Sequence, residues 1–255
     1  MLEGSMVVVT GGTAGIGRAC AEAMLDAGAS GVLINGRDPA RAAAAQAQMQ
    51  ARFPGRHIAI AVGDVAIAQT AQAVMAHAVQ ALGRIDVLVN STGGNDLPQL
   101  LYRTPVADIP GILQRCLFAQ ILCCAAALPA MRDAGRGTVI NIASDAAKIP
   151  TPGESVIGAA MSGIVMFTRA LAVEGKRDGI RANVLTPSMT SGTDHYDKVM
   201  EDPFSGRLFA KAGKMAALGI VSKEELAGLA VFLASPAAAK ITGQAISMTG
   251  GISAL

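Results

Sequence analysis

The sequence predicts a doubly wound α/β fold, in which a single parallel sheet of about seven strands carries helices on both faces. Short apolar segments that fit buried strands alternate with longer segments rich in alanine and leucine that fit helices. The apolar segments contain few polar residues, as strands covered on both faces require. Strand, helix and strand at this spacing favour parallel pairing through right-handed crossovers.

The expected strands are short apolar segments bounded by glycines or polar residues. They cover residues 6–9, 31–35, 57–62, 85–90, 137–143, 179–185 and 244–248. A doubly wound sheet starts in its middle and grows outward on each side. We therefore expect the strand order 3-2-1-4-5-6-7, counted along the chain.

Helices are expected between these strands, at residues 18–27, 39–51, 69–82, 104–134, 153–174 and 226–234. The second begins with Asp38 as its N-cap and Pro39 at its first position. Pro110 is expected to kink or restart the long fourth segment, and a capping box at residues 222–225 precedes the last one. Residues 188–221, with their Gly, Pro, Asp, Met and Phe, are expected to form an irregular lid over a substrate.

The composition indicates a single globular domain over residues 1–255. Hydrophobic residues make up 51% of the chain and charged residues 16%, which excludes a disordered protein. The formal net charge is +2, and no long run of Lys or Arg occurs, which argues against a nucleic-acid partner. No shift in composition marks a second domain.

We expect a cytoplasmic protein without a membrane span or a signal peptide. The most apolar stretch, residues 117–131, is interrupted by Gln120 and Pro129 and is shorter than a bilayer span. Glu3 stands where a signal peptide carries basic residues. The cysteines have no metal-ligand spacing, so no metal is expected and all four are expected to be reduced and buried: Cys20, Cys116, Cys123 and Cys124.

The segment from Thr10 to Gly17, with sequence TGGTAGIG, follows the first strand and opens the first helix, which is the context of a phosphate-binding turn. Gly11 can take the tight turn, Gly15 lets the backbone approach a phosphate, and Gly17 lets helix and strand pack closely. The N–H groups at the helix start then face a pyrophosphate. The alternative is a turn kept for packing alone. The predicted cofactor contacts here are Gly11, Thr13, Gly15, Ile16 and Gly17.

Three residues separate the first two glycines, a spacing that resembles the short-chain dehydrogenase/reductase family rather than the general dinucleotide fingerprint. Other segments resemble the same family: Asp64-Val65, Asn90 to Gly93, Arg181 to Val184 with Pro187, and residues 230–251. The resemblance covers nearly the whole chain and implies one Rossmann-type, dinucleotide-binding domain. It also implies that the adenine ring is held by Asp64 and Val65, and that Asn90, Gly93 and Pro187 lie at the cofactor.

The end of the second strand favours NADP(H) over NAD(H). Enzymes that bind NAD carry an acidic residue there, which takes the ribose hydroxyls. In this chain Gly36 stands at that place and Arg37 follows it, so a guanidinium could bind the 2′-phosphate. Arg18 is a second candidate. The alternative is that Arg37 is only a solvated turn residue.

The resemblance also implies a catalytic tetrad of Asn, Ser, Tyr and Lys, in which Tyr is the general acid or base and Lys lowers its pKa. Aligned on residues 167–172, these positions fall on Cys116, Ser144, Ile157 and Met161. Only the serine is retained. No shift of the alignment restores the Tyr and Lys pair, because the only tyrosines in the sequence are Tyr102 and Tyr196. The lysine position falls on Met161 with the spacing of this family and also with that of the related enoyl reductases. The related enoyl reductases would place their tyrosine at Glu154.

A replacement proton donor has to come from nearby, because a proton must still be transferred near neutral pH. The candidates are Lys148, beyond Ser144, and the lid residues His195 and Tyr196. Asp145, Glu154 and Ser155 are other polar residues expected in this region. The alternatives are a local salt bridge for Lys148 and Asp145 and an exposed loop position for His195.

Two functions remain open from the sequence. The first is an NADP(H)-dependent oxidoreductase that acts on a small carbonyl, imine or activated alkene through a non-standard proton donor. The second is a catalytically inactive protein that binds the dinucleotide as a sensor or partner subunit. In both cases the long apolar helices at residues 105–134 and 153–174 resemble those that pair subunits in the family, so a homodimer or homotetramer is expected.

Overall fold

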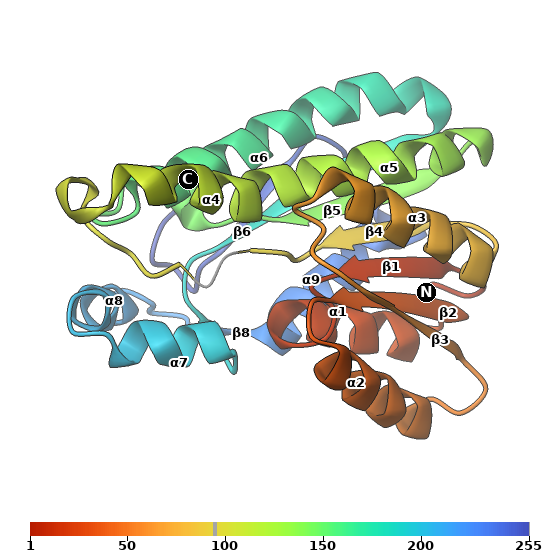
Figure 1. Cartoon of the computed structure of the whole chain (residues 1–255), viewed down its shortest axis with the longest axis horizontal. Helices are drawn as coiled ribbons and strands as arrows, with labels where there is room; N and C mark the ends of the chain where they lie inside the picture. Colours follow the sequence, from red (N-terminus) through yellow and green to blue (C-terminus); the bar gives the residue numbers. More distant parts are fainter. Residues whose placement is uncertain (94–95, 255) are drawn as a thin grey trace.

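The computed structural model describes residues 1–93 and 96–254, and within them seven parallel strands form one sheet (Figure 1). Their order is β3-β2-β1-β4-β5-β6-β9, which confirms the predicted order because β9 is the seventh predicted strand. The strands are β1 (Met6–Thr10), β2 (Gly31–Gly36), β3 (His57–Val62), β4 (Val87–Asn90), β5 (Gly137–Ile142), β6 (Ile180–Pro187) and β9 (Ala245–Met248).

Helices cover both faces of this sheet (Figure 1). One face carries α1 (Gly15–Asp26), α2 (Pro39–Arg52) and α9 (Lys223–Ala234), and the other carries α3 (Ala68–Leu82), α5 (Ala119–Asp133) and α6 (Ser155–Gly175). Alternate residues of β1 reach the two layers: Val7 and Val9 join the core beneath α1 and α9, and Val8 joins the core beneath α3 and α5.

Local signals fix several helix boundaries. The Asp38 carboxylate accepts hydrogen bonds from the N–H groups of Ala40 and Arg41, which confirms the predicted N-cap of α2. The capping box between Ser222 and Glu225 is also present. Pro110 lies in the first turn of α4 (Ile109–Leu113), so it restarts the helix as expected.

Short helical segments complete the connections. After α4 the chain widens into a π-helical segment, η3 (Gln114–Phe118), before α5 begins. The single-turn 3₁₀ segments are η1 (Leu101–Arg103), η2 (Val106–Asp108), η4 (Asp145–Ala147), η5 (Lys176–Asp178) and η6 (Pro236–Ala238).

The lid is more regular than the sequence-based expectation of an irregular segment at residues 188–221. It contains α7 (Asp194–Glu201) and α8 (Ser205–Gly213), and β7 (Thr190–Ser191) pairs with β8 (Val221–Ser222). Thr193 caps α7 by accepting a hydrogen bond from the Tyr196 N–H at 3.1 Å. Asp202 accepts from the N–H groups of the residues that open α8. Side-chain caps therefore stabilise two helices too short to show a clear period in the sequence.

Two helical stretches, residues 106–133 and 155–178, are long and apolar enough to cross a membrane, by length and composition only. This corrects the expectation that no segment reaches that length. Both stretches pack with one side against the sheet, where α5 and α6 also contact each other. Buried helices of a globular core meet the same criterion, so this finding is weak support for a membrane location.

The packing of α1 on β1 generates a stability prediction. A Cβ at Gly17 would lie 2.4 Å from the carbonyl oxygen of Gly11, so Gly17→Ala must push the helix off the strand. We expect this variant to lower the free energy of unfolding by about 1–3 kcal/mol in urea denaturation. Gly228→Ala is the control, because Gly228 is an exposed helical glycine with open space around it, and we expect no loss or a gain of about 0.5–1 kcal/mol. Equal stabilities for the two variants would contradict this packing.

Candidate active site

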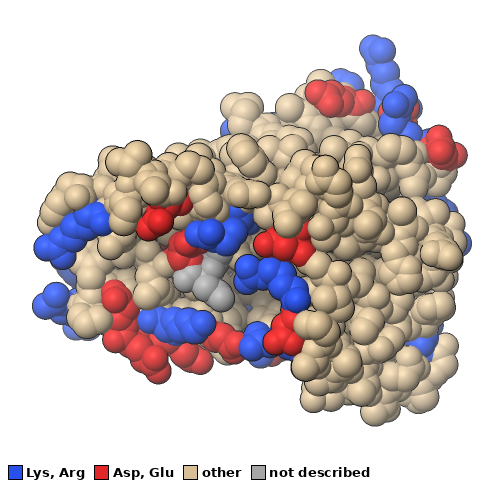
Figure 2. All heavy atoms as spheres, in the orientation of Figure 1, with Lys and Arg blue, Asp and Glu red and all other residues tan. Residues whose placement is uncertain are grey.

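A cavity of about 570 Å³ lies at the carboxyl ends of the central strands, beneath the lid. Its wall combines the start of α1, the segments after β4, β5 and β6, the first turns of α6, and α7 and α8. Ligands of open α/β sheets bind at this edge, where the strand order reverses. Figure 2 shows charged side chains of both signs around the hollow between α4 and the lid helices.

The start of α1 leaves backbone donors for a ligand. Its N-cap residue is Ala14, and no described side chain caps the helix. Gly15 and Ile16, the first helical residues, line the cavity. Gly11 and Gly15 have φ angles of +66° and +54°, the left-handed region that favours glycine. These N–H groups fit the pyrophosphate of a nicotinamide dinucleotide.

The predicted cofactor residues lie at different distances from the cavity. Gly93 and Pro187 line it, as do Gly15 and Ile16. Thr13 is buried against Gly36, where a Cβ would meet its side chain at 2.6 Å. Arg37 is exposed at the end of β2, outside the cavity wall.

The remaining candidates near β3 and α1 have local partners. Asp64 is half-buried and accepts a hydrogen bond from the Ala66 N–H, and its neighbour Val65 is buried. Arg18 is paired with Glu22 on its own helix and with Gln48 of α2. These contacts give both side chains a structural role, and their predicted roles toward a cofactor stay predictions.

Asn90 is placed inside the sheet rather than on the cavity wall. Its amide oxygen accepts from the Thr10 hydroxyl at 3.0 Å, and its amide nitrogen donates to Asn141 at 2.9 Å. The Asn141 amide donates in turn to the Thr168 hydroxyl of α6 at 2.8 Å. This buried network ties β1, β4, β5 and α6 together and fixes the segment that carries Ser91 to Gly93.

The four positions aligned with the tetrad come together in the cavity. Cys116, Ser144, Ile157 and Met161 all line it, from η3, the end of β5 and α6. Ser144 Oγ accepts from the Ala146 N–H at 3.2 Å, so its own proton is available to a ligand. Neither Tyr nor Lys occurs in α6, and Ile157 and Met161 present apolar surface where an ionisable pair would stand. The roles implied by the family resemblance stay predictions.

The three other cysteines have no catalytic character. Burial raises the pKa of the Cys20 and Cys124 thiols to about 12 and also raises the pKa of Cys123. A thiol with such a pKa carries almost no thiolate at neutral pH. This agrees with the expectation of reduced, buried cysteines, and all four are thiols in the structure.

The proposed replacement donors differ in their placement. Lys148 donates a hydrogen bond to Ser247 of β9, does not belong to the cavity wall, and has its pKa lowered chiefly by burial. His195 and Tyr196 line the cavity from the first turn of α7, so the alternative of an exposed loop position for His195 is right in the exposure and wrong in the loop. Desolvation and the nearby Lys198 lower the pKa of His195, although the residue as a whole is exposed.

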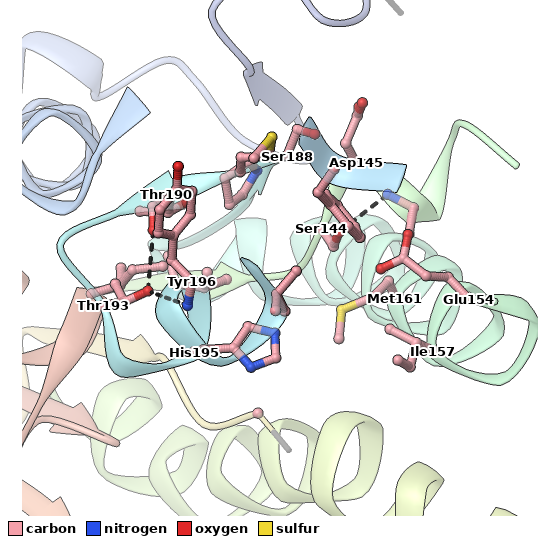
Figure 3. A pocket seen from close by; sticks show the side chains of 18 of the residues that line it. Ser144, Asp145, Glu154, Ile157, Met161, Ser188, Thr190, Thr193, His195 and Tyr196 are labelled. Carbon is pink, nitrogen blue, oxygen red and sulfur yellow. Dashed lines mark hydrogen bonds between the residues drawn. The ribbon is translucent and has the colours of Figure 1, made fainter. Parts of the chain in front are cut away.

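Glu154 is an ionisable residue that the sequence places near the altered positions but does not single out as a proton donor. It precedes α6 directly and lines the cavity one turn before Ile157. Burial, chiefly, and the charge of Asp145 raise its pKa from 4.5 to about 7, against a hydrogen bond with Thr151 that lowers it. In Figure 3 its carboxyl points toward the space between Ser144 and Met161. The sequence signal that could have identified Glu154 is an acidic residue about one helical turn before Ile157.

Arg41 is a second residue that the sequence did not single out. It lies in the first turn of α2, lines the cavity, and forms an ion pair at 3.5 Å with Asp194 of α7. This pair joins the nucleotide-binding half of the cavity to the lid. Both side chains are exposed, so the pair contributes little to stability.

The short chain dehydrogenase family matches residues 5–203. The chain is 31% identical over 251 residues to 2,3-dihydroxy-2,3-dihydro-p-cumate dehydrogenase of Pseudomonas putida, covering 98% of this chain and 95% of that protein. It is 33% identical over 250 residues to the short-chain reductase protein NovJ of Streptomyces niveus, covering 97% and 93%.

Solved structures agree with these relatives. A dehydrogenase/reductase from Sinorhizobium meliloti 1021 superposes with a TM-score of 0.88 at 28% identity, covering 99% of this chain and 96% of that one. A 7α-hydroxysteroid dehydrogenase in complex with NADH and 7-oxo glycochenodeoxycholic acid gives 0.90 at 26% identity, covering 98% and 94%. The sequence match, the sheet order and the glycine turn agree, and the chain belongs to the short-chain dehydrogenase family of oxidoreductases.

Proposed function

We propose that this chain is an NADP(H)-dependent oxidoreductase that acts on a small carbonyl, imine or activated alkene. One observation carries the proposal: a single cavity runs from the uncapped start of α1 to the apolar surface of Ile157 and Met161. The first end suits a pyrophosphate and the second suits a nicotinamide ring beside a substrate. When bound, the reduced dinucleotide supplies the hydride.

The preference for NADP(H) rests on the end of β2. An acidic side chain at position 36 would collide with Thr13, because even a Cβ there lies 2.6 Å from the threonine side chain. The next residue, Arg37, is exposed and can turn toward a 2′-phosphate. Arg41 on the cavity wall adds positive charge nearby.

The proposed proton donor is non-standard. Cys116, Ile157 and Met161 replace three members of the family tetrad, and Ser144 is retained to hold the substrate oxygen. Of the three replacement donors expected from the sequence, His195 and Tyr196 line the cavity, whereas Lys148 is engaged with Ser247.

The second candidate is a protein that binds the dinucleotide without turnover. The apolar pair Ile157 and Met161 favours it, because neither side chain transfers a proton or binds the ribose. A screen for NADPH oxidation with carbonyls, imines and enones distinguishes the two. Consumption of NADPH with any of these supports the enzyme, and tight binding without consumption supports the binder.

The cofactor proposal generates a binding prediction. Calorimetry is expected to give tighter binding of NADPH than of NADH to the wild type. Arg37→Ala is expected to weaken NADPH binding about tenfold, which corresponds to the loss of one charge-assisted contact, and to leave NADH binding unchanged. Arg177→Ala in η5 is the matched control and is expected to change neither. Equal losses for both cofactors in Arg37→Ala would contradict the proposed phosphate contact.

We also propose a cytoplasmic homodimer or homotetramer. Met166 and Val173 of α6 are each 63% exposed, seven residues apart on one face of the helix. Light scattering is expected to give two or four chain masses for the wild type and a smaller mass for Met166→Asp with Val173→Asp. Leu218→Asp, on an exposed lid residue, is the control and is expected to keep the wild-type mass. A monomeric wild type would contradict the proposal.

A further inference from the structure

The first turn of α6 is pressed against the residues that follow Ser144. A Cβ at Gly158 would lie 3.0 Å from the carbonyl oxygen of Ala146, so glycine allows this approach. One turn later the Ser162 hydroxyl donates to the Ala147 carbonyl at 2.9 Å. Because Glu154 precedes Gly158 by one turn, this packing holds Glu154 at the end of α6 that contacts η4.

Glu154 is also held at its backbone. Its carbonyl accepts the Gly158 N–H at 2.5 Å, and its N–H donates to the Thr151 carbonyl at 3.0 Å. Figure 3 shows the carboxyl turned toward Ser144 and Met161, whereas the Asp145 carboxyl points away from them. The Glu154 carboxyl therefore faces the part of the cavity where Ser144 offers its hydroxyl.

The surroundings favour the protonated carboxyl near neutral pH. Ile157 and Met161 provide apolar surface, and the neighbouring Asp145 is a buried acid with one carboxyl oxygen that has no hydrogen-bond partner among the described residues. Burial, chiefly, and the charge of Asp145 raise the pKa of Glu154 to about 7, against a hydrogen bond with Thr151 that lowers it. The other charged or titratable groups on the cavity wall are Cys116, on an element packed against α6, and Arg41, Asp96, Asp194, His195, Tyr196 and Lys198 on the remaining sides, whereas Lys148 follows η4 outside the wall.

We infer that Glu154 donates the proton to a substrate in this cavity, which is the general-acid role of the tyrosine in the family tetrad. The inference rests on the proposed function, because it needs a substrate that receives a hydride. Glu154 suits the role better than His195, because His195 is an exposed residue of the lid, whereas Glu154 is the N-cap residue of α6, the helix that carries Ile157 and Met161.

Reduction of a carbonyl substrate requires one hydride and one proton. The carbonyl carbon receives the hydride supplied by the reduced dinucleotide, and the π electrons move to oxygen. That oxygen takes the proton from the Glu154 carboxyl, so an O–H bond forms on the product and Glu154 becomes a carboxylate. Ser144 donates a hydrogen bond to the same oxygen. Solvent at the cavity mouth then returns a proton to Glu154, and an imine follows the same path with nitrogen in place of oxygen.

The test compares Glu154→Gln with Glu174→Gln, a control at the far, exposed end of the same helix. In infrared titration of the protein without cofactor, the wild type is expected to lose a protonated-carboxyl band with a midpoint near pH 7. Glu154→Gln is expected to lack this band, and Glu174→Gln to keep it. With NADPH and a reactive substrate, Glu154→Gln is expected to reduce kcat about 10²-fold or more, with NADPH affinity unchanged.

The rate of substrate reduction is also expected to depend on pH. Reduction by the wild type is expected to fall as pH rises through about 7, because only the protonated acid donates. Glu154→Asp is expected to keep part of the rate and the falling profile, and Glu154→Gln to lose the profile. If the wild type is active and Glu154→Gln is equally active, or shows the same pH profile, the inference about Glu154 is overturned. The proposed function is not affected by that outcome. A wild type that binds neither dinucleotide overturns the proposed function, and the inference with it.

Thermal unfolding checks the ionisation without any ligand. The folded-state pKa of Glu154 lies above its unfolded value, so its contribution to stability is present at low pH and is lost as pH rises through about 7. Glu154→Gln has no such loss. Its Tm relative to the wild type is therefore expected to be higher at pH 8.5 than at pH 5, and Glu174→Gln to show no such difference. A constant offset between wild type and Glu154→Gln at both pH values would overturn the inference.

Discussion

The close approach of α1 to β1 is the constraint on which the rest of the molecule depends. Gly17 lies against the Gly11 carbonyl and Gly11 lies against the Ser91 carbonyl, at distances that exclude a side chain on either residue. This contact brings the uncapped start of α1 to the edge of the sheet where the paired strands β1 and β4 end. The end of the cavity at the start of α1 therefore depends on close backbone packing. It does not depend on the side chains at positions 116, 157 and 161.

The end of the cavity that Ser144, Ile157 and Met161 line is held by a different kind of interaction. The hydrogen-bonded series from Thr10 through Asn90 and Asn141 to Thr168 lies in the core, where each amide satisfies the next. It couples the central strands to α6 and so fixes the helix that carries Glu154, Ile157 and Met161. The apolar side chains of Ile157 and Met161 and the raised pKa of Glu154 have the same physical cause. Surroundings with little polar surface disfavour a carboxylate, so they raise the pKa of the acid toward neutral pH.

Much of the fold could be predicted because buried parallel strands carry continuous apolar runs and because caps such as Asp38 and Ser222 mark helix starts. The lid was harder, since α7 and α8 are only 8 and 9 residues long and depend on caps from Thr193 and Asp202. The four positions aligned with the tetrad do meet in one cavity, whereas Asn90, Asp64 and Arg37 do not line it. Arg41 was harder to recognise because its partner Asp194 is distant in sequence, and Glu154 because its burial depends on how α6 packs on η4.

We propose that one cavity holds a nicotinamide dinucleotide between the start of α1 and the face of α6 that carries Ile157 and Met161. A crystal structure of the protein with NADPH tests it most directly. We expect the pyrophosphate on the N–H groups of Gly15 and Ile16, and the nicotinamide ring beside Met161 with its reactive face toward Ser144 and Glu154. A dinucleotide bound elsewhere, or a cavity that excludes it at saturating concentration, would contradict the claim.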